Sequence, residues 1–525
     1  MNRQKNLTLL QSTRSEWDLI IVGGGATGLA TAVDAASRGH RVALVEQADF
    51  AKGTSSRSTK LVHGGVRYLK QGDISLVLEA LHERGLLVRN APHLVHPLPF
   101  VIPTYHWWEG PFYGIGLKMY DALAGELGME PSHMLTRDEV LELLPTLETH
   151  GLTGGIIYYD GQFDDSRLAI SLAQTATDHG AVLANYTRCI GLERDAQGHI
   201  QGIQGEDLES GTRFSLRSPV VINATGVFVD ELRHMDRADA PPLVQPSQGV
   251  HLVLPRRFLP GDSAIMIPKT DDGRVLFAVP WHDAVILGTT DTAVAHPSLE
   301  PRALEEEKHF LLTHAARYLT EDPQPSDVLS IFAGLRPLVS NPASDGGTAA
   351  LSRDHTIEIS PNGLLTVTGG KWTTCRRMGQ DVVDQAQLLG RLPRHRCVTE
   401  ELPIHGSTPE ASPTVYGTDQ TAIDDLAATL PDGAERLHPD LPFIQAEVIW
   451  QARQEMARTV EDVLARRTRA LLLDARASAQ AAPLVARLLA QELGQDDAWQ
   501  QAQVAAYRQL AAGYLLTPLD PPASA

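Results

Sequence analysis

The amino-acid sequence predicts an α/β fold in which a parallel β-α-β unit near the N-terminus is followed by an antiparallel sheet region and a helical C-terminal region. Three observations carry this prediction. An apolar strand runs into a glycine-rich turn and a helix over residues 18–39, and short apolar runs broken by Asp-Gly and Pro fill residues 250–292. From residue 424 onward Ala, Leu, Arg and Gln dominate. A chain of 525 residues is long enough for two or three domains.

The first unit has the pattern of a dinucleotide site. A strand over residues 18–22 leads into Gly23-Gly24-Gly25-Ala26-Thr27-Gly28 and then a helix to residue 37. Gly23 permits the tight turn, Gly25 lets the backbone approach a pyrophosphate, and Gly28 lets helix and strand pack closely. The free N–H groups at the start of the helix favour the phosphates.

A second strand, over residues 41–45, ends in Glu46, where a carboxylate would accept hydrogen bonds from the adenosine ribose hydroxyls. No arginine follows Glu46 closely enough to hold a 2′-phosphate, which disfavours NADP. A glycine-rich turn by itself also joins ordinary strands and helices. Here the strand, turn, helix, second strand and acidic residue all come in order, so we expect a dinucleotide to bind.

Residues 52–70 form a basic segment with five cationic side chains and no acidic one. Hydroxyls and the pair Gly64-Gly65 lie between the cations. A solvated loop could carry the same charge. Hydroxyls, backbone amides and cations beside a pyrophosphate site are, however, the groups needed to hold an anion.

A second strand–glycine–helix unit lies near the end of the α/β region. A strand over residues 364–368 runs into Gly369-Gly370-Lys371 and a helix to residue 389. A helix start and a lysine aimed at a flavin would stabilise the anionic reduced ring, although an exposed turn could carry the same lysine. Another strand, over residues 218–224, ends in a turn at Gly226, where the chain would pass back beneath the cofactor.

Composition excludes several classes of protein. The net charge of −19 argues against a nucleic-acid partner. Three scattered cysteines, with no metal-binding spacing, suit a reducing cytoplasm. Residues 1–16 lack the apolar core of a signal peptide, and the uncharged stretch 19–33 is too short and too rich in glycine to span a bilayer. We expect a cytoplasmic protein, either free or peripheral on the inner face of the cell membrane.

An aromatic cluster over residues 105–120 has two interpretations. It contains Trp107, Trp108, Phe112, Tyr113 and Tyr120. Such a cluster can be a packed corner of a domain or a surface that enters a membrane interface.

Two helix starts are predicted from capping patterns. Asp165 or Ser166 is placed to cap a helix after residue 164. In the C-terminal region, residues 459–462 (Thr-Val-Glu-Asp) resemble a capping box before an apolar stripe. A breakpoint is expected at residues 405–409, and the helical region beyond it shows no catalytic constellation.

The ordered set of motifs resembles the FAD-dependent glycerol-3-phosphate dehydrogenases, within the glycine-oxidase-like (DAO) flavoprotein superfamily. The resemblance covers nearly the whole chain from residue 18 to about residue 473. The matching stretches are IIVGGGATGLATAVDAASRG, TSSRSTKLVHGGVRYL, NATG, LGTTD, GLRPL, SRDHTI, GGKWTTCRRM and EMARTVEDVLARRTRALLLDAR. The family commonly reads NATGPW where this chain has Val227-Phe228 after the glycine, which weakens any contact assigned beyond Gly226.

The resemblance implies three domains. The FAD-binding domain would be discontinuous, over 17–87, 152–243 and 350–400. An antiparallel substrate-binding domain would cover 88–151 and 244–349, and a helical domain 405–525. FAD would be bound non-covalently.

The resemblance also implies the site residues. The catalytic residues would be His63, Arg336 and Lys371. The substrate would be bound by Arg67, Tyr68, Arg336, Arg353 and Lys371. The cofactor contacts would be Gly23, Gly25, Gly28, Glu46, Thr54, Ser55, Thr59, Lys60, Leu61, Gly65, Gly226, Gly370 and Thr373.

The implied reaction is oxidation of sn-glycerol 3-phosphate to dihydroxyacetone phosphate, with a quinone as electron acceptor. Several arginines suit a phosphomonoester because guanidinium binds phosphate bidentately and stays charged. His63 has a suitable unperturbed pKa for a base, whereas an arginine would need an exceptional environment. The alternatives are an oxidase that passes electrons to O2 and releases H2O2, and a flavin-binding subunit without turnover. A homodimer is compatible with the sequence, which does not determine the oligomeric state.

Overall fold

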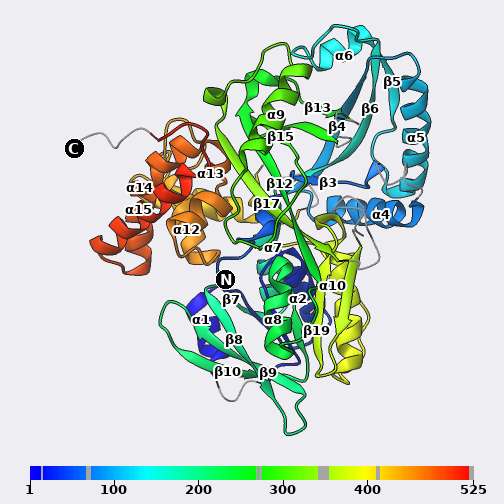
Figure 1. The fold of residues 1–525 in the computed structure, drawn as a ribbon. Helices are drawn as coiled ribbons and strands as arrows, with labels where there is room; N and C mark the ends of the chain where they lie inside the picture. The colour runs from blue at the N-terminus through cyan, green and yellow to red at the C-terminus, as the bar shows by residue number, and fades with distance from the viewer. Residues whose placement is uncertain are drawn as a thin grey trace.

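The structure is a computed structural model that describes residues 1–12, 16–66, 73–267, 270, 275–340, 354–408 and 414–519, without the side chain of Glu126. It confirms the predicted α/β fold with an antiparallel sheet region and a helical C-terminal region (Figure 1). Among the described residues, no helix is long and apolar enough to cross a membrane.

The α/β region is built on a six-stranded sheet. Its strand order is β18 (His355–Ile359), β19 (Leu364–Gly369), β11 (Val221–Asn223), β1 (Leu19–Val22), β2 (Val42–Val45) and β7 (Val182–Ala184). The neighbours are parallel except for β18 and β19. These short strands are almost wholly apolar and buried, as parallel strands covered on both faces must be.

Two layers cover this sheet. On one face, α2 (Ala26–Ser37), α7 (Asp165–Asp178) and α10 (Cys375–Leu389) share the largest apolar core. The other face packs against α1 (Arg3–Leu10), α8 (Val229–Asp236) and a three-stranded sheet. The strands of that small sheet are β8 (Thr187–Arg194), β9 (Ile200–Asp207) and β10 (Arg213–Arg217).

The start of α7 differs from its predicted cap. Asp164, and not Asp165 or Ser166, caps this helix, since its Oδ1 accepts a hydrogen bond from the backbone N of Arg167 at 3.0 Å. The Asp165 carboxylate is engaged elsewhere, in an ion pair with Lys60.

The second region is a larger, mostly antiparallel sheet. Its ten strands are β3 (Leu61–Val62), β4 (Val95–Thr104), β5 (His133–Thr136), β6 (Gly154–Phe163), β12 (Val244–Pro255), β13 (Ala264–Ile267), β14 (Leu276–Trp281), β15 (Ala284–Gly288), β16 (Thr292–Ala293) and β17 (Ser330–Val339). Among the strand pairs formed by described residues, only β4–β13 is parallel in this sheet. Because β6 pairs with β4 along its whole length, this sheet extends to residue 163, past the predicted boundary at 152.

In the described part of the chain, the large sheet is flanked by α4 (Ile74–Asn90), α5 (Glu109–Ala124), α6 (Arg137–Leu143) and α9 (Glu305–Tyr318). The predicted aromatic cluster divides on α5. Tyr120 is buried in the core, whereas Trp107, Trp108 and Phe112 are exposed. The packed-corner interpretation therefore applies to Tyr120, and for the exposed side chains the membrane interface stays a prediction.

The C-terminal region is helical, as predicted. Its elements are α11 (Gln420–Thr429), α12 (Gln445–Gln454), a π-helical turn (Asp462–Arg467), α13 (Ala470–Leu473), α14 (Ala475–Leu493) and α15 (Asp497–Ala512). The predicted capping box is present, since Thr459 and Asp462 exchange backbone-to-side-chain hydrogen bonds of 3.0 and 3.1 Å. The core of this region includes Trp281 and Phe332 of the large sheet, so the two regions share one apolar interior.

Candidate active site

The glycine turn between β1 and α2 has three distinct steric requirements. Gly23 has φ +114°, and a Cβ there would lie 2.5 Å from the carbonyl oxygen of Ala224. At Gly28, a Cβ would lie 1.9 Å from the carbonyl oxygen of Gly23, because helix and strand pack backbone to backbone. At Gly25, a Cβ would meet only the Ser55 hydroxyl, at 3.1 Å, among the described residues. Packing therefore requires Gly23 and Gly28, while the space beside Gly25 is left for a ligand.

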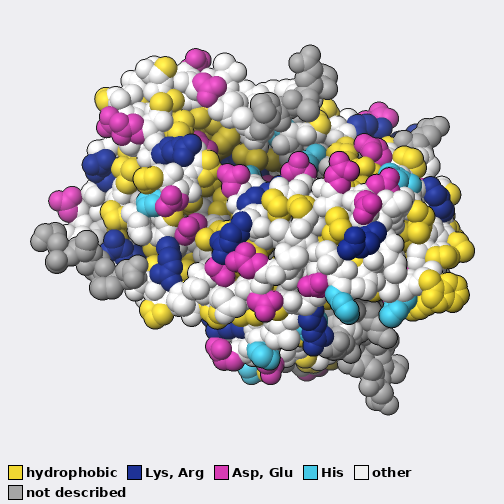
Figure 2. Space-filling view, turned by 90° about the horizontal axis from the view of Figure 1, so that it is seen from above, with side chains coloured by type: hydrophobic (Ala, Val, Ile, Leu, Met, Phe, Trp, Pro, Cys, Tyr) yellow, Lys and Arg dark blue, Asp and Glu magenta, His cyan; other side chains and the backbone are white. Residues whose placement is uncertain are grey.

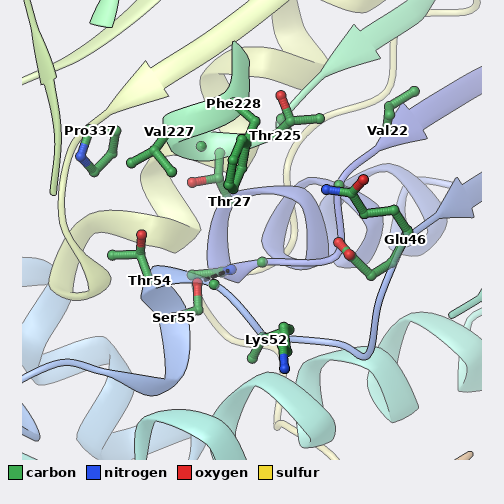
Figure 3. Close-up of a pocket in the computed structure, with 18 of the residues that line it drawn as sticks. Val22, Thr27, Glu46, Lys52, Thr54, Ser55, Thr225, Val227, Phe228 and Pro337 are labelled. Carbon is green, nitrogen blue, oxygen red and sulfur yellow. Dashed lines mark hydrogen bonds between the residues drawn. The ribbon is translucent and has the colours of Figure 1, made fainter. Parts of the chain in front are cut away.

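The N-terminus of α2 opens into a long cavity of about 1240 Å³, which includes its open mouth (Figure 3). Gly25 is the N-cap residue and has no side chain to satisfy the first amides of the helix. The Ser55 hydroxyl accepts one of them, from the backbone N of Ala26 at 2.9 Å. The remaining amides and the helix dipole suit a pyrophosphate.

Glu46 lines the same cavity at the carboxyl end of β2. Its two carboxylate oxygens accept hydrogen bonds from the backbone N of Gly24 at 2.6 Å and of Ala48 at 2.8 Å. Burial raises the pKa of Glu46, and the two N–H donors oppose this rise. These bonds fix the carboxylate in the cavity wall, where each oxygen has a further lone pair for a ribose hydroxyl.

The Gly-Gly-Lys turn after β19 joins this cavity to a second one of about 1090 Å³. Gly369 and Gly370 have φ +81° and +69°, which favour glycine at both positions. The indole Nε1 of Trp372 donates to the carbonyl oxygen of Ser55 at 3.1 Å, which ties this turn to the segment that carries Thr54 and Ser55. Lys371 lines both cavities.

The second cavity brings together side chains from distant segments. They are Arg57, His63, His251, Arg336, Lys371 and Thr373. Three of the six are arginine or lysine, in a chain of net charge −19. Glu300 pairs with Arg57 at 2.6 Å, but no acidic side chain is part of the lining found among the described residues, so the wall of this cavity is basic. A small anionic substrate could reach it despite the repulsion of the whole chain.

His63 is held in this wall by its backbone. Its N–H donates to the Thr373 hydroxyl at 3.1 Å, and the next amide, of Gly64, donates to the buried carboxylate of Asp160 at 3.2 Å. Arg84 forms an ion pair with Asp160 at 2.7 Å. The chain is therefore anchored at His63 and at Gly64.

Arg336 projects from β17 and its side chain is 26% exposed. One terminal nitrogen donates to the Thr289 hydroxyl at 3.0 Å and to the carbonyl oxygen of Thr290 at 3.1 Å. The Asp291 carboxylate lies 3.6 Å from the other nitrogen. A Cβ on Gly249 would lie 2.3 Å from the guanidinium, so this glycine makes room for it.

His251 was not identified from the sequence. Its Nε2 lies 2.9 Å from the Thr59 hydroxyl, and its ring stacks on Phe332 with 4.8 Å between ring centroids. Burial lowers its pKa well below the usual value, and the charges of Arg336 and Lys60 lower it further. A single histidine in an apolar strand gives no signal by itself, and only the pairing of β12 with its neighbours brings it to the cavity.

The side chain of Lys60, predicted as a cofactor contact, forms a buried ion pair. Its Nζ forms a buried ion pair with Asp165 at 2.7 Å and donates to the carbonyl oxygen of Ser56 at 2.8 Å. Burial lowers the pKa of Lys60 to about 7, although Asp165 opposes the shift. Lys60 is absent from the linings found for both cavities in the described part of the chain, and its predicted cofactor contact stays a prediction for its backbone.

The other predicted residues divide between the cavities. The first is lined by Gly23, Gly25, Glu46, Thr54, Ser55, Gly226 and Gly370, and the second by Thr54, Thr59, Leu61, His63, Arg336, Gly370, Lys371 and Thr373. Gly28 and Gly65 are absent from the linings found in the described part of the chain. Arg67, Tyr68 and Arg353 lie outside the described residues.

The site is that of a dinucleotide-dependent oxidoreductase. It combines a glycine turn, an acidic residue at the end of β2, and a basic cavity that joins the dinucleotide cavity. Residues 18–384 match the family described as FAD dependent oxidoreductase, and residues 413–500 match the C-terminal domain of alpha-glycerophosphate oxidase. Human mitochondrial glycerol-3-phosphate dehydrogenase is 40% identical, over 96% of this chain and 74% of its own length. The Arabidopsis thaliana mitochondrial enzyme SDP6 is 40% identical, over 94% of this chain and 86% of its own length.

A solved structure agrees with these matches. Glycerol-3-phosphate dehydrogenase from Bacillus halodurans, complexed with FAD, has a TM-score of 0.81 and 28% identity and covers 99% of both chains. This chain belongs to the FAD-dependent glycerol-3-phosphate dehydrogenase family. Its cofactor is FAD, which the open space at Gly25 and the uncapped amides of α2 fit.

Proposed function

We propose that this chain oxidises sn-glycerol 3-phosphate to dihydroxyacetone phosphate. The observation that carries the proposal is the basic cavity of Arg336, Lys371 and the two histidines, which opens onto the FAD cavity at the Gly-Gly-Lys turn. When bound non-covalently, FAD supplies the acceptor for the hydride that leaves C2 of the substrate.

Arg336 is proposed to bind the substrate anion. Thr289 and Thr290 hold its guanidinium through one terminal nitrogen, and Asp291 lies 3.6 Å from the other, which together orient the side chain in the cavity. A guanidinium matches phosphate bidentately and keeps its charge at any working pH. Arg67, Tyr68 and Arg353 remain predicted partners of the phosphate. Lys371, at the junction of the cavities, is placed to stabilise negative charge that develops during the reaction.

Oxidation at C2 needs a base that accepts the proton of the C2 hydroxyl. His63 is the candidate predicted from the sequence. The structure adds His251 as a second candidate in the same cavity. Burial lowers the pKa of His251 well below the usual value, which keeps the imidazole neutral and able to accept a proton but makes it a weaker base than an unperturbed imidazole. Comparing His63→Asn with His251→Asn would distinguish them, since replacing the base should lower the rate of anaerobic flavin reduction and remove its pH dependence.

We propose a quinone as the electron acceptor, reached at a membrane surface beside α5. The exposed apolar side chains of this segment are Trp107 (85% exposed), Trp108, Phe112, Ile115 and Met119. Figure 2, seen from above, shows hydrophobic side chains gathered at the right-hand edge of the molecule, the side on which α5 lies in Figure 1. Such a patch suits an interfacial contact, with the protein peripheral on the inner face of the cell membrane.

An experiment in two stages, reduction of the flavin by substrate and then its re-oxidation by an acceptor, tests this proposal. Anaerobic addition of sn-glycerol 3-phosphate should bleach the flavin, and a soluble quinone analogue should then restore its colour faster than air-saturated buffer does. Absence of bleaching would contradict the enzymatic proposal and favour the non-catalytic subunit. Faster recovery in O2, with stoichiometric H2O2, would favour the oxidase alternative.

A further inference from the structure

The π-helical turn Asp462–Arg467 and the link that follows it reach into the FAD-binding region with three arginines. They are Arg466, Arg467 and Arg469, which we call the arginine clamp, and all three are buried. Their partners lie about 300 to 400 residues earlier in the chain. Figure 1 shows the orange and red C-terminal helices against the side of the molecule where α7 and the β12–β17 pair lie.

The first anchor of the clamp is Asp49, which has no exposed surface. Arg466 Nε contacts Asp49 Oδ2 at 2.6 Å, and Arg467 donates to both carboxylate oxygens, at 3.0 Å to Oδ1. Asn185 also donates to Oδ1, at 3.1 Å. Asp49 follows Glu46 by one short turn, so this anchor fixes the loop that leaves the ribose-binding end of the cavity.

The second anchor lies at the far end of the same loop. Arg469 donates to the carbonyl oxygen of Ser56 at 2.9 Å and to Asp165 at 2.8 Å. Asp165 in turn accepts from the backbone and side chain of Ser58 and from Lys60. The clamp therefore holds the loop 49–60 near both of its ends.

The loop between the anchors carries residues of the FAD cavity. Lys52, Thr54 and Ser55 all line it, and Figure 3 shows these three side chains along the same wall. Lys52 forms a further ion pair with Glu461, whose carboxylate also contacts Arg466 at 2.6 Å. The C-terminal region thus reaches a cavity-lining side chain through one shared carboxylate.

We propose that the arginine clamp is a positioning element of the flavin site, which holds loop 49–60 in the shape that binds FAD. Buried ion pairs contribute little net stability, because desolvating the charges offsets their attraction. They do fix one geometry, since each charge must keep its partner. The middle of the loop is held by the buried Phe50 side chain and by hydrogen bonds of Thr54 to Leu335 and of Trp372 to Ser55, whereas the clamp holds its two ends. Removing the clamp should therefore shift the loop ends and weaken FAD binding more than it weakens the fold.

The test uses two single variants of the full chain in which the carboxylate at each anchor keeps another cationic partner. In Arg469→Gln, Asp165 keeps Lys60, and in Arg467→Met, Asp49 keeps Arg466. In Arg469→Gln, Asp164 also loses a 3.4 Å contact with the guanidinium but keeps the hydrogen bond from the backbone N of Arg167. The matched control is Arg453→Gln, which removes an ion pair with Glu492 at 2.6 Å in the same region, away from loop 49–60. Each protein is stripped of FAD, and the FAD Kd is measured by quenching of flavin fluorescence, alongside the Tm of the apoprotein.

We expect both clamp variants to raise the FAD Kd by about tenfold or more, the size of effect that loss of an outer-shell partner has at metal sites. The apoprotein Tm should stay within a few degrees of the parent, and the control should bind FAD as the parent does. An unchanged Kd in both clamp variants would overturn the proposal. Apoproteins that no longer fold would also overturn the proposal, because the clamp would then serve general stability. The double variant Asp49→Asn with Arg467→Met removes one positive and one negative charge together. It repeats the FAD Kd measurement without a buried charge imbalance.

Discussion

The glycine turn allows a prediction in which two similar substitutions have opposite consequences. Gly25 has φ −86° and ψ −176°, which any residue can adopt, and a Cβ there meets only the Ser55 hydroxyl among the described residues. Gly25→Ala should therefore fold, at a cost of about 1 kcal/mol or less for an N-cap position. Gly28→Ala would place a Cβ 1.9 Å from a backbone oxygen, which forces β1 and α2 apart and should cost about 3 kcal/mol or more.

The added methyl at Gly25 occupies the space where the pyrophosphate approaches the backbone. Losing one charge-assisted hydrogen bond costs about 1.5–3 kcal/mol, which is roughly a tenfold to hundredfold increase in the FAD Kd. The larger Gly25→Val should abolish binding.

The assay is titration of the apoprotein with FAD, followed by flavin fluorescence, with the apoprotein Tm measured in parallel. Acid precipitation of the parent should release FAD and no FMN. An unchanged FAD Kd in Gly25→Ala would refute the reasoning, because the pyrophosphate would then lie elsewhere in the cavity. A Gly28→Ala protein with the parental Tm would refute the steric argument.

The remaining predictions concern the substrate, the membrane and pH. Arg336→Leu should lower kcat/KM for sn-glycerol 3-phosphate by roughly 30-fold to several thousand-fold, from a loss of about 2–5 kcal/mol, with normal FAD content; an unchanged kcat/KM would contradict its role. Arg353→Leu should do the same while barely changing the turnover of glycerol, which has no phosphate, and an equal loss on both would exclude it as the phosphate partner. Trp107→Ser with Trp108→Ser should reduce liposome binding and quinone reduction but not anaerobic flavin reduction, and unchanged co-sedimentation with liposomes would count against a membrane surface there. Burial raises the pKa of Glu447 to about 7 from 4.5, so the folded protein binds more protons than the unfolded chain and loses stability as pH rises from about 4.5 to 7. Glu447→Gln should remove this loss of about 3 kcal/mol, with a higher Tm than the parent at pH 8 and no gain at pH 4, and equal Tm shifts at both pH values would show that the carboxyl does not titrate in this way.

Local patterns in the sequence determined the elements whose geometry is set by neighbours along the chain. The Gly23–Gly28 turn, the carboxylate at the end of β2 and the Gly369-Gly370 turn were predicted from consecutive residues, because allowed dihedral angles and helix amides are local properties. The capping box at Thr459 and Asp462 is of the same kind. The ordered motifs, through their resemblance to a known family, also predicted the fold class, the cofactor and the family.

The tertiary structure decided whatever depends on pairing between distant segments. His251 reaches the second cavity through the register of β12, and β6 joins the large sheet through its pairing with β4. Asp165 looked like a helix cap and Lys60 like a cofactor contact, but the chain folds them into one buried ion pair. Nothing near Arg466, Arg467 or Arg469 indicates that they reach loop 49–60. A buried charge takes its partner from whichever segment packs against it, and that partner is fixed only once the whole chain has folded.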